Sequence, residues 1–224
     1  MRASNLLWIT GLVMLLVLAN VNAWGAEIKP YEPQDFSRLK GMKGFSDQLL
    51  QQHFTLYEGY VKNTNLLLTQ MTQMAQQNQM TTPQYAELKR RFSWEFNGMR
   101  LHELYFSNLG GNGQINKEGK LYKSLEANFG SYDRWLADFK AMGGMRGIGW
   151  VVLYEDLKTG RLMNVWINEH NEGNLAGCVA LLVMDVFEHA FLTDYGLKKA
   201  DYLEAFFQNL DWPAVEARYH AHHN

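Results

Sequence analysis

The stretch that most constrains the fold of this chain runs from Val179 to Tyr195, VALLVMDVFEHAFLTDY. It begins with an apolar run of strand length and then places Asp185, Glu188 and His189 among apolar neighbours. Burying two acids and a histidine is costly unless they are paired or bind a metal. An Asp and a His four residues apart can offer an oxygen and a nitrogen to one Mn or Fe ion. An ordinary hydrogen bond between Asp185 and His189 is the simpler explanation of this pair alone, so the rest of the chain must decide.

Composition narrows the classes of function. The 224 residues can bury a sizeable core, as one domain or two small ones. The formal net charge of −2 provides no electrostatic surface for nucleic acid or an anionic membrane, so these partners are not expected. Because Cys178 is the single cysteine, an internal disulfide is excluded, and the core or a bound metal must hold the fold together.

The N-terminus is typical of a secretory signal peptide. Arg2 precedes the apolar run 6–19, and Val21-Asn22-Ala23 places small residues at a cleavage site. We therefore expect residues 1–23 to be removed, no stable membrane span after removal, and a periplasmic or secreted protein. An uncleaved membrane anchor is the alternative, although the apolar run is short for a span. The following residues 27–42 are predicted to form an extended leader.

Two long helices are predicted between residues 46 and 109. In residues 46–77, apolar and aromatic side chains recur at spacings of three and four, and His53 and Tyr60 lie on this face. A second helix, from about Gln84 to Leu109, carries His102 on an aromatic face. A histidine on such a face is more often a satisfied core residue than a ligand. The helices should form an antiparallel hairpin that ends at the glycine-rich residues 110–113, giving an N-terminal domain of residues 24–113.

The second half combines helices with strands. Short amphipathic helices are predicted over 121–129 and 132–142, and a further helix over 200–207. Strands are predicted over 150–154, 162–167 and 179–186, the first two joined as a hairpin at Thr159-Gly160. We therefore expect an α+β fold: an N-terminal antiparallel helical hairpin, followed by an α/β domain of residues 114–224 with a small three-stranded antiparallel sheet.

The seven histidines divide into two groups. His220, His222 and His223 belong to a polar C-terminal tail and are most simply solvated. The other four are distributed over the two long helices, a polar loop and the end of the third strand: His53, His102, His170 and His189. Three imidazoles and one carboxylate, from Asp185, would suit Mn or Fe and leave a position for solvent or a small substrate.

The chain resembles the iron/manganese superoxide dismutases. The segment from Asp185 to Trp212, DVFEHAFLTDYGLKKADYLEAFFQNLDW, looks like the family signature DxWEHAYxxDYxxxRxxYxxxFWxxxNW. Residues 129–143 and the GxGW of residues 147–150 resemble the helix and the first strand that family members carry. His102-Glu-Leu-Tyr-Phe106 looks like the second-helix ligand motif, and His53 followed by 60–65 looks like the first helix. The resemblance covers most of residues 46–212 in the right order.

The resemblance implies specific roles. His53, His102, Asp185 and His189 would bind one Fe or Mn ion per subunit. The implied reaction converts superoxide to dioxygen and hydrogen peroxide, with the ion cycling between 3+ and 2+. His170 would hydrogen-bond solvent on the metal, Tyr60 would stand at the mouth of the substrate channel, and Trp150 would lie beside the metal. Gly98 would be the small residue one turn before His102. Glu188 would bridge to the partner subunit's His189 in a homodimer. A small apolar wall would exclude larger reductants: Phe54, Phe106, Trp150 and Phe187.

The sequence departs from the family around the channel. The spacing from His53 to Tyr60 is one residue shorter than usual, which predicts a regular helix without the family's bulge. Leu56 or Tyr57 stands where the gateway histidine is expected, and Leu192 replaces the tyrosine it would bond across the dimer. Phe106 and Phe187 take positions where tryptophan is usual.

Three alternatives to an active dismutase follow from these departures and from the ligand types. An exported, metal-binding superoxide dismutase homologue with weak or lost activity is favoured most by the altered gateway. A mononuclear non-haem iron oxygenase would need a facial triad and a larger pocket. A pure interaction module would not need four inward histidines.

Overall fold

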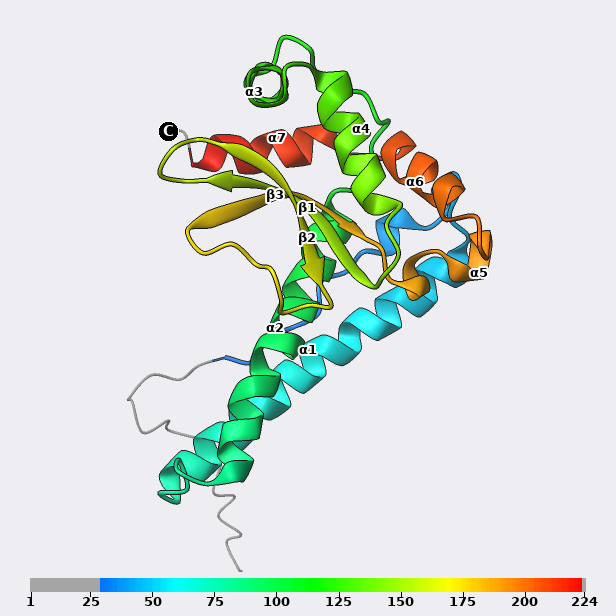
Figure 1. Ribbon diagram of the computed structural model, residues 1–224. Coiled ribbons are helices and arrows are strands. Elements are labelled where there is room, and N and C mark those ends of the chain that lie inside the picture. Colours follow the sequence, from blue (N-terminus) through cyan, green and yellow to red (C-terminus); the bar gives the residue numbers. More distant parts are fainter. Residues whose placement is uncertain (1–28, 223–224) are drawn as a thin grey trace, which may run out of the picture.

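The structure, a computed structural model, describes residues 29–222 and has a helical hairpin followed by a three-stranded antiparallel sheet with its covering helices (Figure 1). This is the α+β architecture that the sequence predicts. The predicted signal peptide, residues 1–23, lies outside the described residues. Within residues 29–222, every helix is too short or too polar to cross a membrane.

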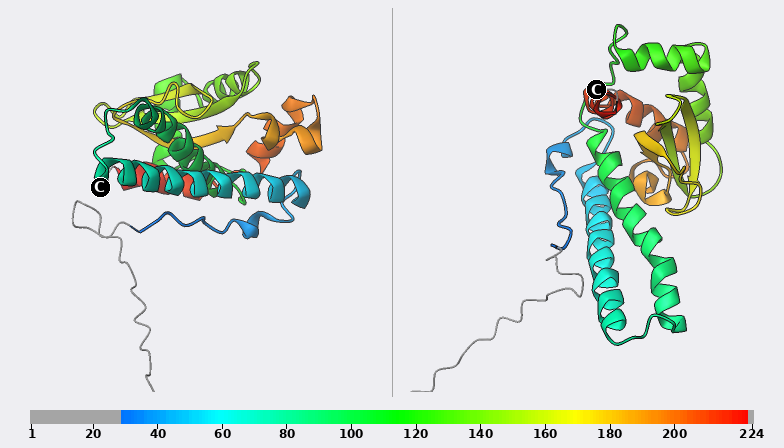
Figure 2. Two further views of the ribbon diagram at one scale, coloured as in Figure 1. Left: turned by 90° about the horizontal axis from the view of Figure 1, so that it is seen from below. Right: turned by 90° about the vertical axis from the view of Figure 1, so that its left-hand side faces the viewer.

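The hairpin consists of α1, Asp47–Gln76, and α2, Pro83–Ser107. Ser46 caps α1 by accepting a hydrogen bond from the Leu49 amide, and Thr82 caps α2 in the same way, followed by Pro83 in the first turn. The helices run antiparallel and side by side; one end of the hairpin packs at the sheet, and the turn end projects away from it (Figures 1 and 2). The ends of α1 and α2 that carry His53 and His102 lie far from the turn, at the sheet.

The predicted extended leader is wrong in part. Residues 29–36 lie along the hairpin, where the backbone of Tyr31 exchanges two hydrogen bonds with the side chain of Asn65. The chain then forms a short 3₁₀-helix, Ser37–Leu39, and buries Phe36 and Leu39. These apolar side chains contribute to the core, so the segment is part of the folded unit.

The sheet contains β1, Gly149–Asp156, β2, Leu162–Asn168, and β3, Cys178–Asp185, in the order β2-β1-β3. The central strand β1 is almost entirely buried, which matches its continuous apolar sequence. Opposite Trp150 on β1 lies Ile167 on one side and Asp185 on the other. This register brings the last residue of β3 beside the aromatic start of β1.

Helices cover the sheet and complete the C-terminal half. They are α3, Lys120–Phe129, α4, Tyr132–Gly143, α5, Leu192–Tyr195, α6, Lys199–Gln208, and α7, Trp212–Ala221, with a 3₁₀-helix η2 over Glu188–Ala190. Ser131 caps α4 by accepting a hydrogen bond from the Arg134 amide. In Figure 1, α4, α6 and α7 lie on the side of the sheet away from the projecting hairpin turn.

The interpretation of the C-terminus as a polar tail is wrong. Residues up to Ala221 form α7, which Asp211 caps through the Ala214 amide, with Pro213 in its first turn. Arg218 anchors this helix by donating to the Asn108 side chain and the Leu181 carbonyl. The sequence contains a start signal for this helix, an Asp cap followed by a proline. The histidines near the C-terminus instead suggested a solvated tail.

The two halves share one continuous core. Buried apolar side chains of the hairpin, the sheet and the C-terminal helices form a single cluster. The glycine-rich turn after α2 is tied to the end of α6, since Gly110 donates to Asn209 O and Gly113 donates to Leu210 O. The division into domains of residues 24–113 and 114–224 therefore stays a prediction.

Candidate metal centre

Four side chains far apart in sequence meet where the hairpin joins the sheet. His53 comes from the buried face of α1, His102 from α2, Asp185 from the last position of β3, and His189 from η2. These four residues are called the ligand cluster below. His53, His102 and Asp185 are buried, and the His189 side chain is 27% exposed. The cluster is thus closed on the core side and reaches solvent only at its η2 side.

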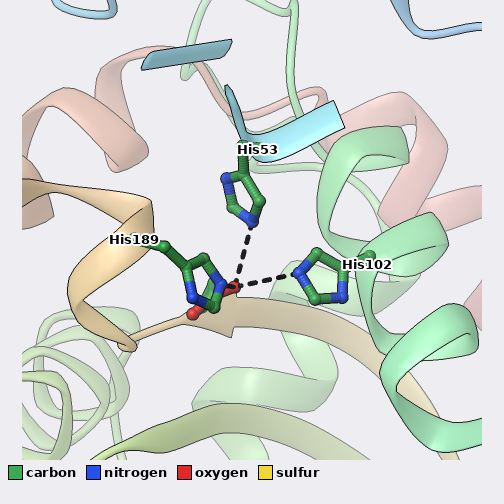
Figure 3. Close-up of side chains that lie close together, drawn as sticks. His53, His102 and His189 are labelled. Carbon is green, nitrogen blue, oxygen red and sulfur yellow. Dashed lines mark hydrogen bonds and ion pairs between the residues drawn. The ribbon is translucent and has the colours of Figure 1, made fainter. Parts of the chain in front are cut away.

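One carboxylate oxygen is the centre of the ligand cluster. Asp185 Oδ2 lies 3.2 Å from His53 Nε2, 3.1 Å from His189 Nε2 and 3.6 Å from His102 Nε2. Figure 3 shows the imidazoles of His53, His102 and His189 pointing from different directions toward a common centre. The rest of the aspartate is fixed as well. Its Oδ1 accepts from the Phe187 amide at 2.8 Å, and its main-chain carbonyl accepts from the Tyr202 hydroxyl at 2.6 Å.

These separations fit the ligand atoms of a single metal ion. One atom from each of the four residues lies within 4.8 Å of all the others. Metal–ligand bonds of about 2.1 Å place ligand atoms about 3.0 Å apart at right angles and about 3.6 Å apart at 120°. Three imidazole nitrogens with one carboxylate oxygen suit Mn or Fe. The ligand cluster therefore fits one Fe or Mn ion.

His102 supplies independent support for this fit. Its Nδ1–H donates to the Gly98 carbonyl, one helical turn earlier, at 2.6 Å. This hydrogen bond fixes the tautomer and directs the lone pair of Nε2 into the ligand cluster. Nε2 is buried and has no hydrogen-bond partner among residues 29–222. A buried acceptor without a partner is costly, and a metal ion satisfies it.

The charges are those that metal binding needs. Burial lowers the pKa of His53, and it holds the pKa of His102 well below its usual range. Burial opposes ionisation of Asp185, but its interactions and hydrogen bonds with the imidazoles of His189 and His53 outweigh it, so the pKa of this carboxyl is strongly lowered. At neutral pH, His53 and His102 are therefore unprotonated and Asp185 is ionised, the states in which they bind metals.

His170, Tyr60 and Trp150 form a hydrogen-bonded chain next to the ligand cluster. The indole N–H of Trp150 donates to His170 Nδ1 at 3.1 Å, so the ring carries its proton on Nε2. That Nε2–H then donates to the Tyr60 oxygen, 2.7 Å away, and the Tyr60 hydroxyl keeps its own proton to donate. Burial lowers the pKa of His170 to about 4 and raises the pKa of Tyr60 to about 12, so both are neutral.

Gly98 explains why Tyr60 reaches this position. A Cβ at residue 98 would lie 2.6 Å from Tyr60 Cδ1, so only glycine leaves room for the tyrosine ring. The ring stacks on His102, with centroids 5.2 Å apart. Tyr60 follows His53 at a spacing of seven positions in regular α-helix, since α1 is uninterrupted as the short spacing predicts. Both side chains thus face the same centre, two turns apart.

Comparison with known proteins identifies the family. Residues 117–218 match the family described as iron/manganese superoxide dismutases, C-terminal domain. The chain is similar to superoxide dismutase [Fe] of Cupriavidus metallidurans, 37% identical over 185 residues that cover 80% of this chain and 91% of that protein. It is 33% identical over 196 residues to superoxide dismutase [Fe] of Aquifex pyrophilus, covering 84% and 90%. It is 33% identical over 175 residues to superoxide dismutase [Mn] 2 of Haloferax volcanii, covering 78% and 86%.

The chain belongs to the iron/manganese superoxide dismutase family. This is an oxidoreductase family, and the relatives above carry names with either metal, consistent with a ligand cluster of nitrogen and oxygen donors that suits both. The resemblance first seen in residues 185–212 is therefore confirmed over most of the chain.

The departures from the superoxide dismutase pattern lie outside the ligand cluster. Tyr57, near the expected gateway histidine, is buried; its hydroxyl donates to Glu103 and accepts from the Gln34 amide. Its hydroxyl therefore bonds within the hairpin and to the segment that precedes it, and its ring lies near His102, with centroids 6.4 Å apart. Leu192 is 46% exposed. Both residues of the family's gateway pair are thus replaced in this chain. The hydrogen-bonded chain of Tyr60, His170 and Trp150 is complete.

Aromatic rings enclose the superoxide dismutase site, and the sequence predicted four of them: Phe54, Phe106, Trp150 and Phe187. Phe106 and Trp150 contact His53 and His102, and Phe187 stacks on His170 and His189. The prediction missed Trp94, whose ring edge meets His170 with centroids 4.9 Å apart. The signal was its position two helical turns before His102, on the same side of α2.

Proposed function

We propose that this chain is a superoxide dismutase that binds one Fe or Mn ion through His53, His102, Asp185 and His189. The observation that carries the proposal is the buried carboxylate of Asp185 with three imidazole nitrogens around it, of which His102 Nε2 has no hydrogen-bond partner among the described residues. Membership of the family supports the reaction 2 O₂•⁻ + 2 H⁺ → O₂ + H₂O₂.

The bound ion would supply the one-electron couple between the 3+ and 2+ states. The chain supplies the charge balance, because neutral imidazoles and a single carboxylate leave a net positive centre that attracts a small anion. A second carboxylate in the ligand set would reduce that charge. The Phe187 amide holds the Asp185 carboxylate, which cannot swing away without losing this hydrogen bond, and the Tyr202 hydroxyl holds the main chain of the same residue.

Proton delivery is assigned to Tyr60 and His170. Because His170 donates its Nε2–H to the Tyr60 oxygen, the phenolic proton is free to donate toward an anion at the ligand cluster. Tyr60 holds this proton at neutral pH, since burial raises its pKa to about 12. Trp150 restricts rotation of the His170 ring by donating to its other nitrogen. The pair thus presents one oriented O–H donor.

Size selection is assigned to the aromatic wall. Phe54, Phe106, Trp150 and Phe187 have exposed fractions of 9% or less. The last three contact the imidazoles of the ligand cluster, and Phe54 packs behind them on Phe106. A diatomic anion needs little space, whereas a larger organic reductant would have to displace these packed rings. The wall also keeps water away from His53 and His102, which favours their neutral state.

The test is expression of residues 24–224, loading with Fe or Mn, and measurement of bound metal and superoxide removal in the same samples. We expect about one ion per chain and activity that rises with metal content. A preparation with full activity after metal removal would contradict the mechanism. A preparation with one ion per chain and negligible activity would favour the second candidate function.

That second candidate is an exported superoxide dismutase homologue that keeps the metal and has weak or lost activity. The observation that favours it is the altered gateway, with Tyr57 turned into the hairpin and Leu192 exposed on the surface. The intact Tyr60–His170 hydrogen bond argues for turnover, and we therefore rank the active enzyme first.

Localisation and assembly are further parts of the proposal. Export rests on the signal-peptide pattern of residues 1–23, and would place the enzyme where it meets external superoxide. A homodimer would bring Glu188, which is exposed beside His189, to the partner's His189. Glu188→Ala should then weaken the dimer in sedimentation experiments and leave metal binding intact at high protein concentration. Unchanged dimer dissociation would remove Glu188 from the interface.

A further inference from the structure

Trp94 is an aromatic residue of the site for which the dismutase mechanism above has no role. It comes from α2, and its ring edge meets the His170 ring with centroids 4.9 Å apart and planes at 82°. Three other rings already surround His170. Trp150 and Tyr60 bond its two nitrogens, and Phe187 stacks on one face with centroids 4.8 Å apart. Trp94 therefore completes an enclosure around a residue that donates to Tyr60.

His170 needs such an enclosure because it sits on a loop. It follows β2, and the preceding Glu169 has φ +53°, in the left-handed region that non-glycine residues seldom adopt. A loop residue has more freedom than one on a helix or strand, yet His170 is fully buried. Contacts from other elements must therefore fix the ring, and Trp94 brings the rigid helix α2 against it.

A second set of contacts holds Trp94 itself. The Arg91 guanidinium lies over the indole ring, 4.9 Å from its centroid, one turn earlier on α2. Arg91 is held in turn by Glu95, through Nε to Oε1 at 2.7 Å and Nη2 to Oε1 at 2.6 Å. Glu95 is 3% exposed and also accepts from Asn63 of α1 at 3.3 Å. Asn63 lies three residues after Tyr60, so these contacts join both helices beside the proton donor.

We propose that Trp94 is a positioning residue that orients His170, and that Arg91 holds the Trp94 ring in place. The inference rests on the proposed dismutase function for its kinetic consequence. Attraction of the anionic substrate is not the role of Arg91, because its charge is balanced by the Glu95 carboxylate at hydrogen-bond distance. The effect acts through ring packing: loss of the indole lets His170 turn, and the hydrogen bond to Tyr60 loosens.

The experiment compares Trp94→Leu, Trp94→Phe and Arg91→Gln in the metal-loaded protein. Trp94→Leu keeps an apolar side chain but loses the ring edge, so kcat should fall about tenfold at unchanged metal content and nearly unchanged KM. Trp94→Phe restores an aromatic edge and should recover most of kcat. Arg91→Gln should lower kcat about threefold, the effect of losing an exposed cation–π contact. Arg90→Gln is the matched control, since Arg90 is the neighbouring arginine and pairs with the exposed Glu87.

Azide titration of the metal-loaded protein, followed by absorption, provides a readout that does not depend on turnover. Because Tyr60 would donate to a bound anion, Trp94→Leu should raise the azide Kd about tenfold, and Trp94→Phe should leave it near the parent value. Values of kcat and azide Kd within twofold of the parent in Trp94→Leu would overturn the proposal. Should Trp94→Leu not fold, Arg91→Gln decides in the same way. A parent that binds azide without dismutating superoxide would contradict the proposed function alone, because the azide comparison still tests Trp94.

Discussion

The ligand cluster and the gateway region beside it differ in how closely they match the family pattern. His53 and His102 are carried by regular helices and Asp185 by a strand. All three are buried, and the Nε2 atoms of both histidines lie within 3.6 Å of Asp185 Oδ2. In the gateway region, Leu192 is half exposed, and Tyr57 is buried in the hairpin, where its hydroxyl donates to Glu103. The ligand cluster is thus complete, whereas the residues of the family's gateway are replaced.

This difference indicates that metal binding and turnover depend on different residues. Metal affinity depends on four ligand atoms and on the hydrogen bonds that orient them, all of which are present. Turnover depends in addition on Tyr60 and His170, which lie between the two regions. Substitutions in the ligand cluster should therefore remove the metal. Substitutions at Tyr60, or at residues that hold it in place, should slow the reaction and leave the metal bound.

The largest effect is expected for Asp185→Ala. Asp185 Oδ2 is the one oxygen that lies near all three imidazoles, so its loss should remove metal and activity together. Metal content by mass spectrometry and superoxide removal measure both. His220→Ala, on the half-exposed surface of α7, is the control and should change neither. Retention of one ion per chain in Asp185→Ala would show that this carboxylate is not a ligand.

Gly98→Ala should give the next largest effect. The new methyl group would lie 2.6 Å from Tyr60 Cδ1, so the ring must move and its hydrogen bond to His170 must lengthen. A displacement of this size should lower kcat by about thirtyfold with the metal retained. The matched control is Gly59→Ala on α1, where a Cβ would meet no heavy atom of residues 29–222 within 4 Å. Equal kinetics for the two variants would mean that Tyr60 has no role in turnover.

Periodicity placed the ligand-cluster residues on buried faces, and the resemblance to the family implied their role as ligands. His53 and His102 lie on helix faces defined by spacings of three and four, and Asp185 follows an apolar run of strand length and character. The three-stranded sheet followed from the turn at Thr159-Gly160 and from the apolar runs on either side of it.

Periodicity could not predict the contacts that join elements. The burial of His170 depends on the path of a loop, and a polar loop gives no signal of burial. Trp94 was missed because the ring that it contacts, His170, lies 76 residues later in the chain. Helix α7 was missed because three histidines made its end look like a solvated tail, although Asp211 and Pro213 marked its start.

Tyr60→Phe should have a smaller effect than the displacement of the whole ring. The phenyl ring can still stack on His102 and support it, but the O–H donor is lost. We expect metal content to stay at the parent level and kcat to fall about tenfold. Stopped-flow measurement of superoxide decay at several concentrations separates kcat from KM. A parallel loss of metal would instead show that Tyr60 is needed for metal binding, and would contradict the distinction between metal-binding residues and turnover residues.

The smallest effect concerns the stability of the metal-free protein between pH 6.5 and pH 4. Burial lowers the pKa of His170 from 6.5 to about 4, so below pH 6.5 the unfolded chain binds a proton that the folded chain does not. Stability from this group is therefore complete above pH 6.5 and is lost as the pH falls toward 4, by an amount on the order of 2 kcal/mol. Urea unfolding of the metal-free parent and of His170→Gln measures it, because glutamine does not titrate. His53 and His102 shift in the same direction and remain in both proteins, so the difference between the two pH profiles isolates His170. Parallel profiles would mean that water reaches this ring in the folded protein, and that the enclosure by Trp94, Trp150 and Phe187 is open in solution.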